Sequence, residues 1–322
     1  MHDHMKILKK QDAEKTVFTC NPQYGKGEII TYEPSDGIDV NYVDFHMNGS
    51  YTMIPEFDRT DILEINYCVH GKYECEFKDQ TVIYLCDGDF SVWSGKGEAI
   101  AADSSYKPYK GISIRVNIEK AAPSIYQILK DRQIDLSVCV HQTLSGKTSI
   151  IAKPGAKIQH IFDELYDLPS RYALDYIRIK VAELLLLVYS GGFTYEESGI
   201  KQYQRKYVQS AKDTRAYIEE HFSEHMTIAS LAKQNCINAS QLMECFKYIY
   251  GMTITDFLLR TRMAKASELL LNADIKVADI SLLVGYANPS KFAEAFKRVY
   301  GASPIKYRND NAPKIKMVSE YF

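Results

Sequence analysis

The chain has 322 residues, 46% of them hydrophobic and 25% charged, and its formal net charge is −2, which is ordinary for a globular protein of two or three domains. No apolar run reaches membrane-spanning length, and the N-terminal segment MHDHMKILKK lacks the apolar core of a signal peptide. Because the seven cysteines include no CxxC pair, we expect reduced thiols and a cytoplasmic protein.

Short segments of alternating apolar and polar residues follow one another from about residue 41 to residue 118. Their sequences are YVDFHM, ILEINYCVH, KYECEF, TVIYL, DFSVWS and GISIRVNI, with turn signals such as His70-Gly71 and Asp87-Gly88 between them. Regular short strands of this kind predict a β-barrel or a β-sandwich. In ILEINYCVH, the alternation predicts one face with Leu63, Ile65, Tyr67 and Val69 and another with Glu64, Asn66, Cys68 and His70.

Aromatic residues are frequent, with 24 tyrosines and a single tryptophan. Those on the predicted strands indicate a pocket for an aromatic ligand inside the barrel. The candidate ligand-binding residues are Tyr42, Tyr67, Tyr84 and Trp93. Two alternatives stay open. These side chains belong to the core or the surface, or the N-terminal half binds no small molecule and serves only dimerisation or a protein partner.

An enzyme is an alternative to a binding protein, because many small β-barrels hold a catalytic metal. Such a site needs two histidines one residue apart on a strand, with a carboxylate and a third histidine nearby. The barrel segment has only His46 and His70, isolated from each other, and no Ser/His/Asp signature, P-loop or GxGxxG fingerprint occurs. We therefore expect no catalytic residues, no metal ligands, no cofactor and no enzymatic activity.

Helical patterns replace the strand patterns from about Ala122. The segment LDYIRIKVAELLLLVYS is apolar over more of its circumference than a lone surface helix needs. Its continuous apolar stripe is predicted to form part of a subunit interface, and a helix packed on its own barrel is the alternative. The stripe consists of Ile177, Val181, Leu184, Leu185 and Val188.

The C-terminal third differs from the rest in charge. Residues 201–322 carry 18 Lys and Arg against 12 Asp and Glu, a net of 18 − 12 = +6, whereas residues 1–200 carry 21 against 29, a net of −8. A basic region on an acidic remainder points to a polyanionic partner.

An internal repeat organises this basic region. The segments FKYIYGMTITDF and FKRVYGASPIKY align at a separation of 50 residues. Each segment begins in the second helix of a pattern of short helix, turn and second helix, and the second turn is one residue longer. Thr227 and Asn288 are predicted N-caps, and Gly285 can end a helix in the left-handed conformation. Phe292, Ala295, Phe296 and Val299 are expected to form the buried face of the last long helix.

A long amphipathic helix is predicted between the two copies of the repeat. It begins with a capping-box pattern at Thr253 and Asp256 and runs to about Asn272. Such a helix would hold the two helix-turn-helix units at a fixed separation.

The order of these motifs resembles the DNA-binding domain of the AraC family of transcription regulators. The resemblance covers roughly residues 205–308 and includes RTRMAKASELL, ISLLVGYANPSKF and FKRVYGASPIKYR. The wording YANPSKFAEAFKRVYG is most similar to the branch that includes siderophore-responsive regulators of pyochelin and yersiniabactin systems.

The resemblance implies that residues 239–249 and 289–299 are recognition helices, which enter two successive major-groove segments of double-stranded DNA. Many family members have arginine where this chain has Glu244 and Glu294, so the preferred operator should differ, unless these glutamates are merely solvated or paired with a lysine. The implied DNA-binding residues are Ser240, Gln241, Glu244, Lys247, Ser290, Lys291, Glu294, Lys297 and Arg298.

The resemblance also implies an α+β architecture of three parts. Residues 1–121 would form a cupin-like effector-binding barrel, residues 122–200 a helical dimerisation and linker region, and residues 201–322 the all-α DNA-binding domain with two helix-turn-helix units. The expected function is an effector-responsive activator with a small-molecule effector, a homodimeric state, a contact with RNA polymerase and no membrane partner. A regulator without a small effector is the alternative, and a cupin-type metalloenzyme is a remote one.

Overall fold

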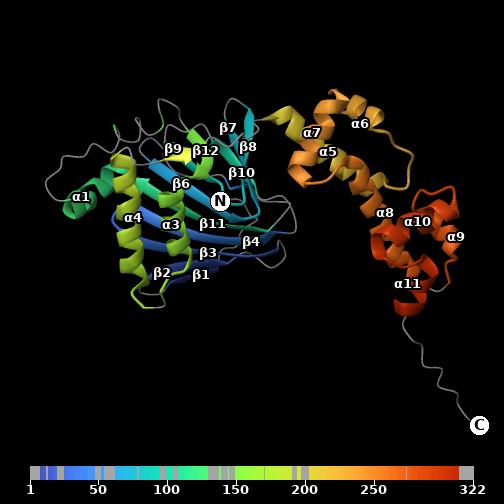
Figure 1. Ribbon diagram of the computed structural model, residues 1–322, viewed down its shortest axis with the longest axis horizontal. Coiled ribbons are helices and arrows are strands. Elements are labelled where there is room, and N and C mark those ends of the chain that lie inside the picture. The colour runs from blue at the N-terminus through green and yellow to red at the C-terminus, as the bar shows by residue number, and fades with distance from the viewer. Residues whose placement is uncertain are drawn as a thin grey trace, which may run out of the picture. The chain divides into compact units, whose positions relative to one another are not determined.

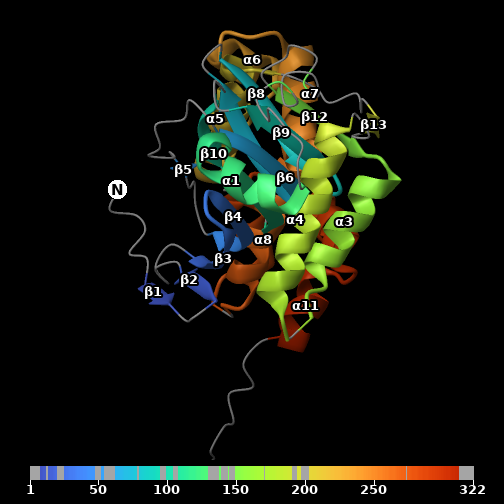
Figure 2. The ribbon, with the colours of Figure 1, turned by 90° about the vertical axis from the view of Figure 1, so that its left-hand side faces the viewer.

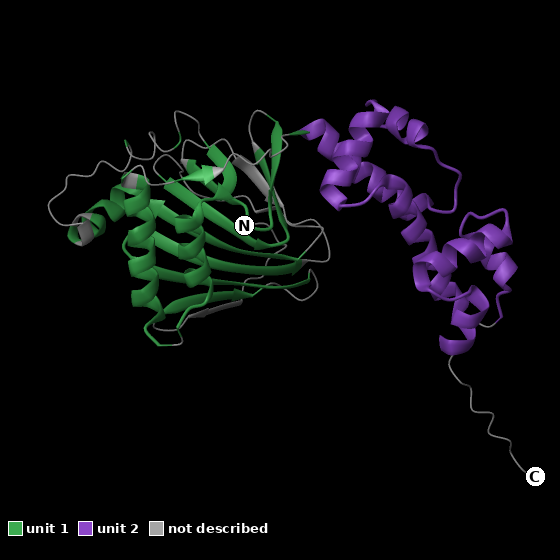
Figure 3. Cartoon of the chain, in the orientation of Figure 1, with its two compact units in different colours: residues 1–203 green, residues 204–322 purple. Residues whose placement is uncertain are grey.

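The computed structural model of the chain describes residues 8–11, 14–19, 25–47, 52–53, 62–77, 80–94, 99–103, 108–129, 138, 144, 149–169, 171–190, 194–196, 203–272 and 274–311. The chain divides into two compact units, residues 1–203 and residues 204–322, which are coloured separately in Figure 3. The helices expected as a separate dimerisation region fall in the first unit, together with the strands.

Two open antiparallel sheets form the framework of the first unit. The larger sheet has nine strands in the order β1 (Leu8–Gln11), β2 (Lys15–Thr19), β3 (Gly25–Ser35), β4 (Ile38–Met47), β11 (Tyr109–Asn117), β6 (Ile62–His70), β9 (Phe90–Ser94), β12 (Ser149–Pro154) and β13 (Tyr195–Glu196). The smaller has five, in the order β14 (Tyr203–Gln204), β8 (Thr81–Cys86), β7 (Lys72–Phe77), β10 (Ala99–Asp103) and β5 (Thr52–Met53). All six predicted strand segments are confirmed, but neither sheet closes, so the described residues do not form the predicted barrel.

Helices α3 (Ala156–Tyr166) and α4 (Ala173–Tyr189) lie side by side across one face of the larger sheet, as Figures 1 and 2 show. A third helix, α1 (Ile118–Leu129), follows β11 directly. The predicted apolar face of β6 is confirmed, since Leu63, Ile65 and Tyr67 are buried in the core that these helices cover. Burial of so much apolar surface between helices and sheet stabilises this unit.

The apolar stripe of α4 belongs to this core rather than to the protein surface. Its five residues, Ile177, Val181, Leu184, Leu185 and Val188, are each at most 2% exposed and pack with residues of the sheet and of α3. They therefore offer no surface to a second subunit, and the predicted interface role of these residues is wrong. The alternative, a helix packed on its own sheet, is what the structure shows.

The four aromatic residues predicted to bind a ligand do not meet in one pocket. Tyr42 donates a hydrogen bond from Oη to the backbone oxygen of Leu165 (2.8 Å), and Tyr67 stacks on Phe162 with ring centroids 4.6 Å apart, so both lie under α3. Tyr84 instead donates from Oη to Oε2 of the buried Glu74 (2.7 Å), within the smaller sheet. Trp93 donates from Nε1 to Oγ of Ser91 (2.6 Å).

We expect Tyr42→Phe to destabilise the first unit by about 1–2 kcal/mol, because it leaves the Leu165 carbonyl without its partner. Burial raises the pKa of Tyr42, as expected for a tyrosine in the core. Urea unfolding followed by the fluorescence of Trp93, the single tryptophan, would report on this unit. Tyr166→Phe on α3 is the control, since Tyr166 is 52% exposed and should change stability by less than about 0.5 kcal/mol. Equal unfolding midpoints for the two variants would contradict the structural role.

The opposite face of the larger sheet carries a row of polar residues. Strand register places Asn41 opposite Ser113, Ser113 opposite Asn66, and Asn66 opposite Ser91. Ser91, Asn66 and Ser113 are at most 9% exposed, and Asn66 Nδ2 lies 3.4 Å from the Ser91 hydroxyl. Ser113 also donates from Oγ to Oε1 of Glu64 (3.2 Å), so these three residues have protein partners, whereas the buried Nδ2 of Asn41 has none. Because a buried polar group without a partner is unfavourable, the Asn41 end of the row is a candidate for ligand recognition.

Apart from Gln204 at the end of β14, the regular elements described in the second unit are helices. They are α5 (Arg205–His221), α6 (Ile228–Gln234), α7 (Ala239–Tyr250), α8 (Ile254–Leu270), α9 (Val277–Leu283), α10 (Pro289–Tyr300) and α11 (Pro304–Asn311). The predicted caps are confirmed. Thr227 Oγ1 accepts a hydrogen bond from the Ser230 backbone NH, and Thr253 Oγ1 accepts one from the Asp256 NH at 3.1 Å. Local capping thus sets the starts of α6 and α8.

Candidate nucleic-acid interface

The two helix-turn-helix units are α6–α7 and α9–α10, and their turns have the same hydrogen bonds. Cys236 donates its backbone NH to Lys233 and Ile237 donates to Ala232; 49 residues later, Gly285 donates to Leu282 and Tyr286 to Ser281. The equivalent residues Cys236 (φ 53°) and Gly285 (φ 82°) both adopt the left-handed conformation. This pattern ends each first helix and turns the chain toward the second.

Asparagine begins each second helix and glycine ends it. Asn238 accepts from the Ser240 NH (2.7 Å), and Asn288 accepts from the Ser290 NH (2.8 Å) ahead of Pro289 at the first helical position. Gly251 and Gly301 take positive φ angles at the other ends. The separation of 50 between the asparagines, against 49 in the turns, confirms that the second connection is one residue longer.

Apolar side chains anchor both second helices in the unit. In α7 the buried residues are Leu242, Cys245, Phe246, Ile249 and Tyr250. In α10 they are Phe292, Ala295 and Phe296. Val299 is 38% exposed, so its predicted place on the buried face is wrong. The face of α10 that contacts the unit therefore ends one turn earlier than the periodicity indicated.

All nine residues predicted to contact DNA are exposed on the two second helices: Ser240, Gln241, Glu244 and Lys247 on α7, and Ser290, Lys291, Glu294, Lys297 and Arg298 on α10. Lys247, Lys297 and Arg298 lie in the last turns of their helices. Each helix thus presents polar groups that can donate to or accept from base edges near its start, and cations that can meet phosphates near its end.

One neighbour of this surface was missed by the sequence analysis. Tyr207 of α5 accepts a hydrogen bond through Oη from Nε2 of Gln241, with 3.1 Å between the two atoms. The two residues are 34 positions apart, so no helical periodicity connects them. Only the packing of α5 against α7 brings them together.

Helix α8 makes polar contacts with the loop after α5 and with the second helix-turn-helix unit. Arg262 donates from Nε to the Phe222 backbone oxygen (2.7 Å) and from Nη2 to that of Glu224 (2.8 Å), and its guanidinium lies 5.5 Å from the Tyr286 ring centroid. Tyr300 of α10 donates from Oη to Oγ of Ser267 (3.0 Å). These contacts tie the loop after α5, helix α8 and the second helix-turn-helix to one another.

Other kinds of site find little support in the described residues. His46 lies 3.6 Å from Asp44 and His70 lies 3.3 Å from Asp87, and no group of three or more His, Cys, Asp or Glu side chains in this part of the chain could hold a metal. No described helix has both the length and the apolar character that a membrane span requires.

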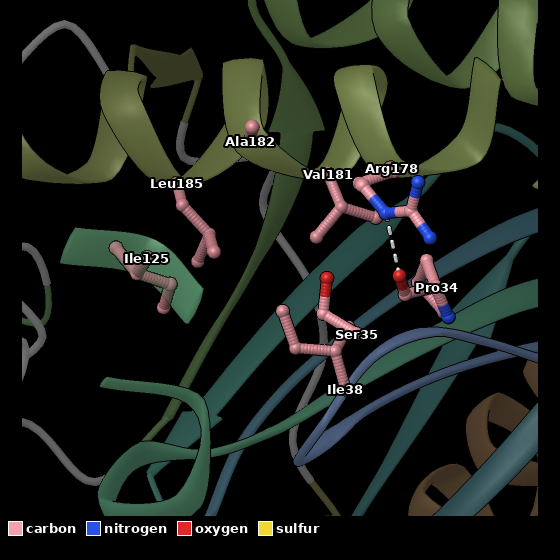
Figure 4. Close-up of a pocket in the computed structure, with 8 residues that line it drawn as sticks. All are labelled: Pro34, Ser35, Ile38, Ile125, Arg178, Val181, Ala182 and Leu185. Carbon is pink, nitrogen blue, oxygen red and sulfur yellow. Dashed lines mark hydrogen bonds between the residues drawn. The ribbon is translucent and has the colours of Figure 1, made fainter. Parts of the chain in front are cut away.

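A small cavity lies between the β3–β4 turn, α1 and α4 (Figure 4). Apolar side chains such as Ile38, Ile125 and Leu185 line it, together with Arg178, which donates from Nε to the Pro34 backbone oxygen at 2.7 Å. Its volume of about 10 Å³ is that of roughly one water molecule. It leaves no room for a small-molecule effector.

Comparison with known proteins supports the site. Residues 231–310 match a helix-turn-helix domain family. The probable transcriptional regulator LumQ of Photobacterium leiognathi is 32% identical over 92 residues, which cover 29% of this chain and 37% of LumQ. The lactose operon transcription activator of Staphylococcus xylosus is 32% identical over 93 residues, 29% of this chain and 33% of that protein. The chain thus spans only about a third of the length of these two relatives.

One solved structure is similar to about a third of the chain. The C-terminal domain of AraT, a response regulator from Geobacillus stearothermophilus, is 30% identical, with a TM-score of 0.33, over 35% of this chain and 93% of the AraT domain.

Proposed function

We propose that this chain, whose C-terminal unit is a DNA-binding helix-turn-helix domain of the AraC family, inserts α7 and α10 into two successive major-groove segments of one operator. The observation that carries the proposal is that the two helix-turn-helix units are built alike, with equivalent turns, asparagine caps and exposed polar faces. A major groove admits one helix, and successive turns lie about 34 Å apart, so one rigid domain can engage both.

The chemistry of each second helix divides between reading and positioning. Ser240, Gln241 and Glu244 on α7 would contact base edges, as would Ser290, Lys291 and Glu294 on α10. A glutamate can accept from the N4 amino group of cytosine, whereas lysine can donate to guanine. The cations at the helix ends, Lys247, Lys297 and Arg298, would contact phosphates and set the register without reading sequence.

Replacing one cation and one carboxylate of α10 by alanine, each in a separate variant, tests whether the first contacts phosphate and the second reads a base. Lys297→Ala should weaken binding to all sequences alike. It should also reduce the slope of log affinity against log salt concentration by about one, because one fewer counterion is released. Glu294→Ala should instead relax the preference at one base pair, at a cost of about 1–3 kcal/mol on the preferred operator. Binding selections on randomised duplexes at two salt concentrations separate these results. If Glu294→Ala leaves the selected sequence unaltered, Glu294 does not read a base.

The N-terminal unit supplies regulation in this proposal. The two-unit architecture supports an effector that changes DNA affinity by a coupling free energy of about 1–3 kcal/mol, and DNA must change effector affinity by the same factor. The place proposed for the effector is the polar row of Asn41, Ser113, Asn66 and Ser91, because the buried Nδ2 of Asn41 has no hydrogen-bond partner there. Mass spectrometry of small molecules that copurify with the native protein would identify it. If the protein binds that molecule with the same affinity in the presence and absence of operator DNA, the allosteric role is contradicted.

Three further parts of the proposal rest on resemblance. The wording of residues 286–301 supports the siderophore-responsive branch, and a relative named as a transcription activator supports activation. The contact with RNA polymerase and the cytoplasmic location are implied by the family resemblance. A regulator without a small effector is the second candidate, and it is favoured by the small size of the cavity of Figure 4, which has room for roughly one water molecule.

A homodimer, if it uses α4, must use the outer face of that helix. Ile179 is 63% exposed and Leu186 is 43% exposed, and their spacing of seven places them on one stripe. The double variant Ile179→Glu, Leu186→Glu should therefore sediment as a folded monomer where the wild type is a dimer. Ile305→Glu, which changes a residue 61% exposed on α11, is the control and should sediment like the wild type. Dimerisation of the double variant at wild-type strength would exclude this face.

A further inference from the structure

We infer that Tyr207 is a positioning residue, which orients the side-chain amide of Gln241 so that it discriminates adenine in the first half of the operator. This inference rests on the proposed function, because it requires α7 to lie in a major groove. Its basis is the hydrogen bond from Gln241 Nε2 on the exposed first turn of α7 to Tyr207 Oη on α5, at 3.1 Å.

The hydrogen bond leaves the reading groups of Gln241 available. The side-chain amide has two N–H donors and one carbonyl acceptor, and Tyr207 uses one donor. The second N–H and Oε1 remain, which are the two groups that bind N7 and the N6 amino group of adenine together. If the amide were rotated by half a turn, donor and acceptor would exchange places and the match to adenine would be lost. The Tyr207 hydroxyl selects the useful orientation when its own proton is donated to another acceptor, because its oxygen can then only accept, and Nε2 rather than Oε1 must face it.

Tyr207 is suited to hold this orientation because it is itself restrained. Its side chain is partly buried, and it follows directly on Lys206, whose Nζ lies 4.8 Å from the ring centroid. The next residue, Val208, is 2% exposed and anchors α5 in the unit. Since the hydroxyl of Tyr207 accepts from Gln241, its own proton can be donated to a phosphate oxygen. The pair thus connects a base contact to a position on the backbone.

The second recognition helix has a different chemistry at the equivalent position. Lys291 stands 50 residues after Gln241 and is exposed on the first turn of α10. A lysine is a flexible point charge with three donors, and its partner in a major groove is guanine. We therefore expect the two halves of the operator to differ, with a sharp adenine preference under α7.

Binding selections with the full chain on randomised duplexes test the inference, using the wild type, Tyr207→Phe, Gln241→Ala and the double variant. Gln241→Ala should reduce the preference for adenine at one position by about 10-fold or more. Tyr207→Phe should reduce the same preference by about 2- to 10-fold, the range expected for losing the restraint on one side chain. In the double variant, Tyr207→Phe should have no further effect on that position.

The control is Tyr217→Phe on the same helix, because the Tyr217 hydroxyl bonds to Glu224 rather than to a residue of α7. It should leave the selected sequence unchanged. A Tyr207→Phe protein that weakens binding to all sequences equally, or that changes nothing while Gln241→Ala relaxes the adenine preference, would overturn the positioning role and leave the proposed function intact. If Gln241→Ala also leaves the preference unchanged, both the inference and the assignment of Gln241 as a reader fail.

Discussion

Replacing Gly285 by alanine is expected to destabilise the C-terminal unit by about 2–5 kcal/mol. Gly285 has φ 82° in the turn of the second helix-turn-helix, and an added Cβ would lie 2.5 Å from the Ser223 backbone oxygen. The left-handed conformation costs alanine roughly 1–2 kcal/mol, and overpacking against backbone adds about 1–3 kcal/mol. Helix loss on heating, followed by far-ultraviolet circular dichroism, measures the effect.

Gly301→Ala separates the two causes. Gly301 has φ 74°, but a Cβ added to it would meet no atom within 4 Å, so alanine there should cost only the conformational term of roughly 1–2 kcal/mol. Neither variant should change the unfolding of the first unit reported by Trp93. If the two alanine variants unfold at the same temperature, the close approach of Gly285 to Ser223 does not constrain the turn.

Arg262→Ala is expected to lower both stability and operator affinity, because Arg262 on α8 joins the loop after α5 to the second helix-turn-helix unit. Its removal leaves the backbone oxygens of Phe222 and Glu224 without these donors and takes away the group that packs on Tyr286, at a cost of about 2–3 kcal/mol. Looser spacing between α7 and α10 should then weaken binding to a full operator by about 10-fold or more, since both helices must fit at once.

The control for Arg262 lies on the same helix. Lys265 forms an exposed ion pair with Glu268 at 2.8 Å, so Lys265→Ala should change stability by less than about 1 kcal/mol. Arg262→Lys keeps the charge, but lysine cannot donate from two fixed nitrogen atoms, and this variant should resemble alanine more than arginine. Operator titrations at a temperature where all variants are folded test the account. If Arg262→Ala binds the operator with wild-type affinity, the contacts of Arg262 are not needed to hold α7 and α10 at the spacing that DNA binding requires.

The parts of the fold that the sequence predicted are those set by local chemistry. Asn288 before Pro289 and Thr253 before Asp256 specify helix starts through their own side chains, and both caps are present. Alternation in β6 likewise predicted that Leu63, Ile65 and Tyr67 share one buried face. Such signals need only neighbours in the sequence, so they can be recognised without knowledge of the tertiary structure.

The failures concern what an apolar or aromatic residue packs against. The stripe through Val181 and Leu184 showed that α4 has a buried face, but not that the chain's own sheet covers it. Tyr42 and Trp93 both lie on strands, yet strand register and the placement of α3 put them in different surroundings. The bond between Gln241 and Tyr207 joins residues of separate helices. These relations depend on long-range packing, which a periodic pattern does not encode.

If the proposed function is right, the C-terminal unit contacts two successive major-groove segments through α7 and α10. A hydroxyl-radical footprint of the full chain on its selected duplex tests it most directly. We expect two protected segments on one side of the duplex, about 10 base pairs apart. In the double variant Lys291→Ala, Lys297→Ala of α10, only one of the two segments should lose protection. A single protected segment in the wild type, or equal loss of protection at both segments in that variant, would show that α7 and α10 do not bind two separate major-groove segments.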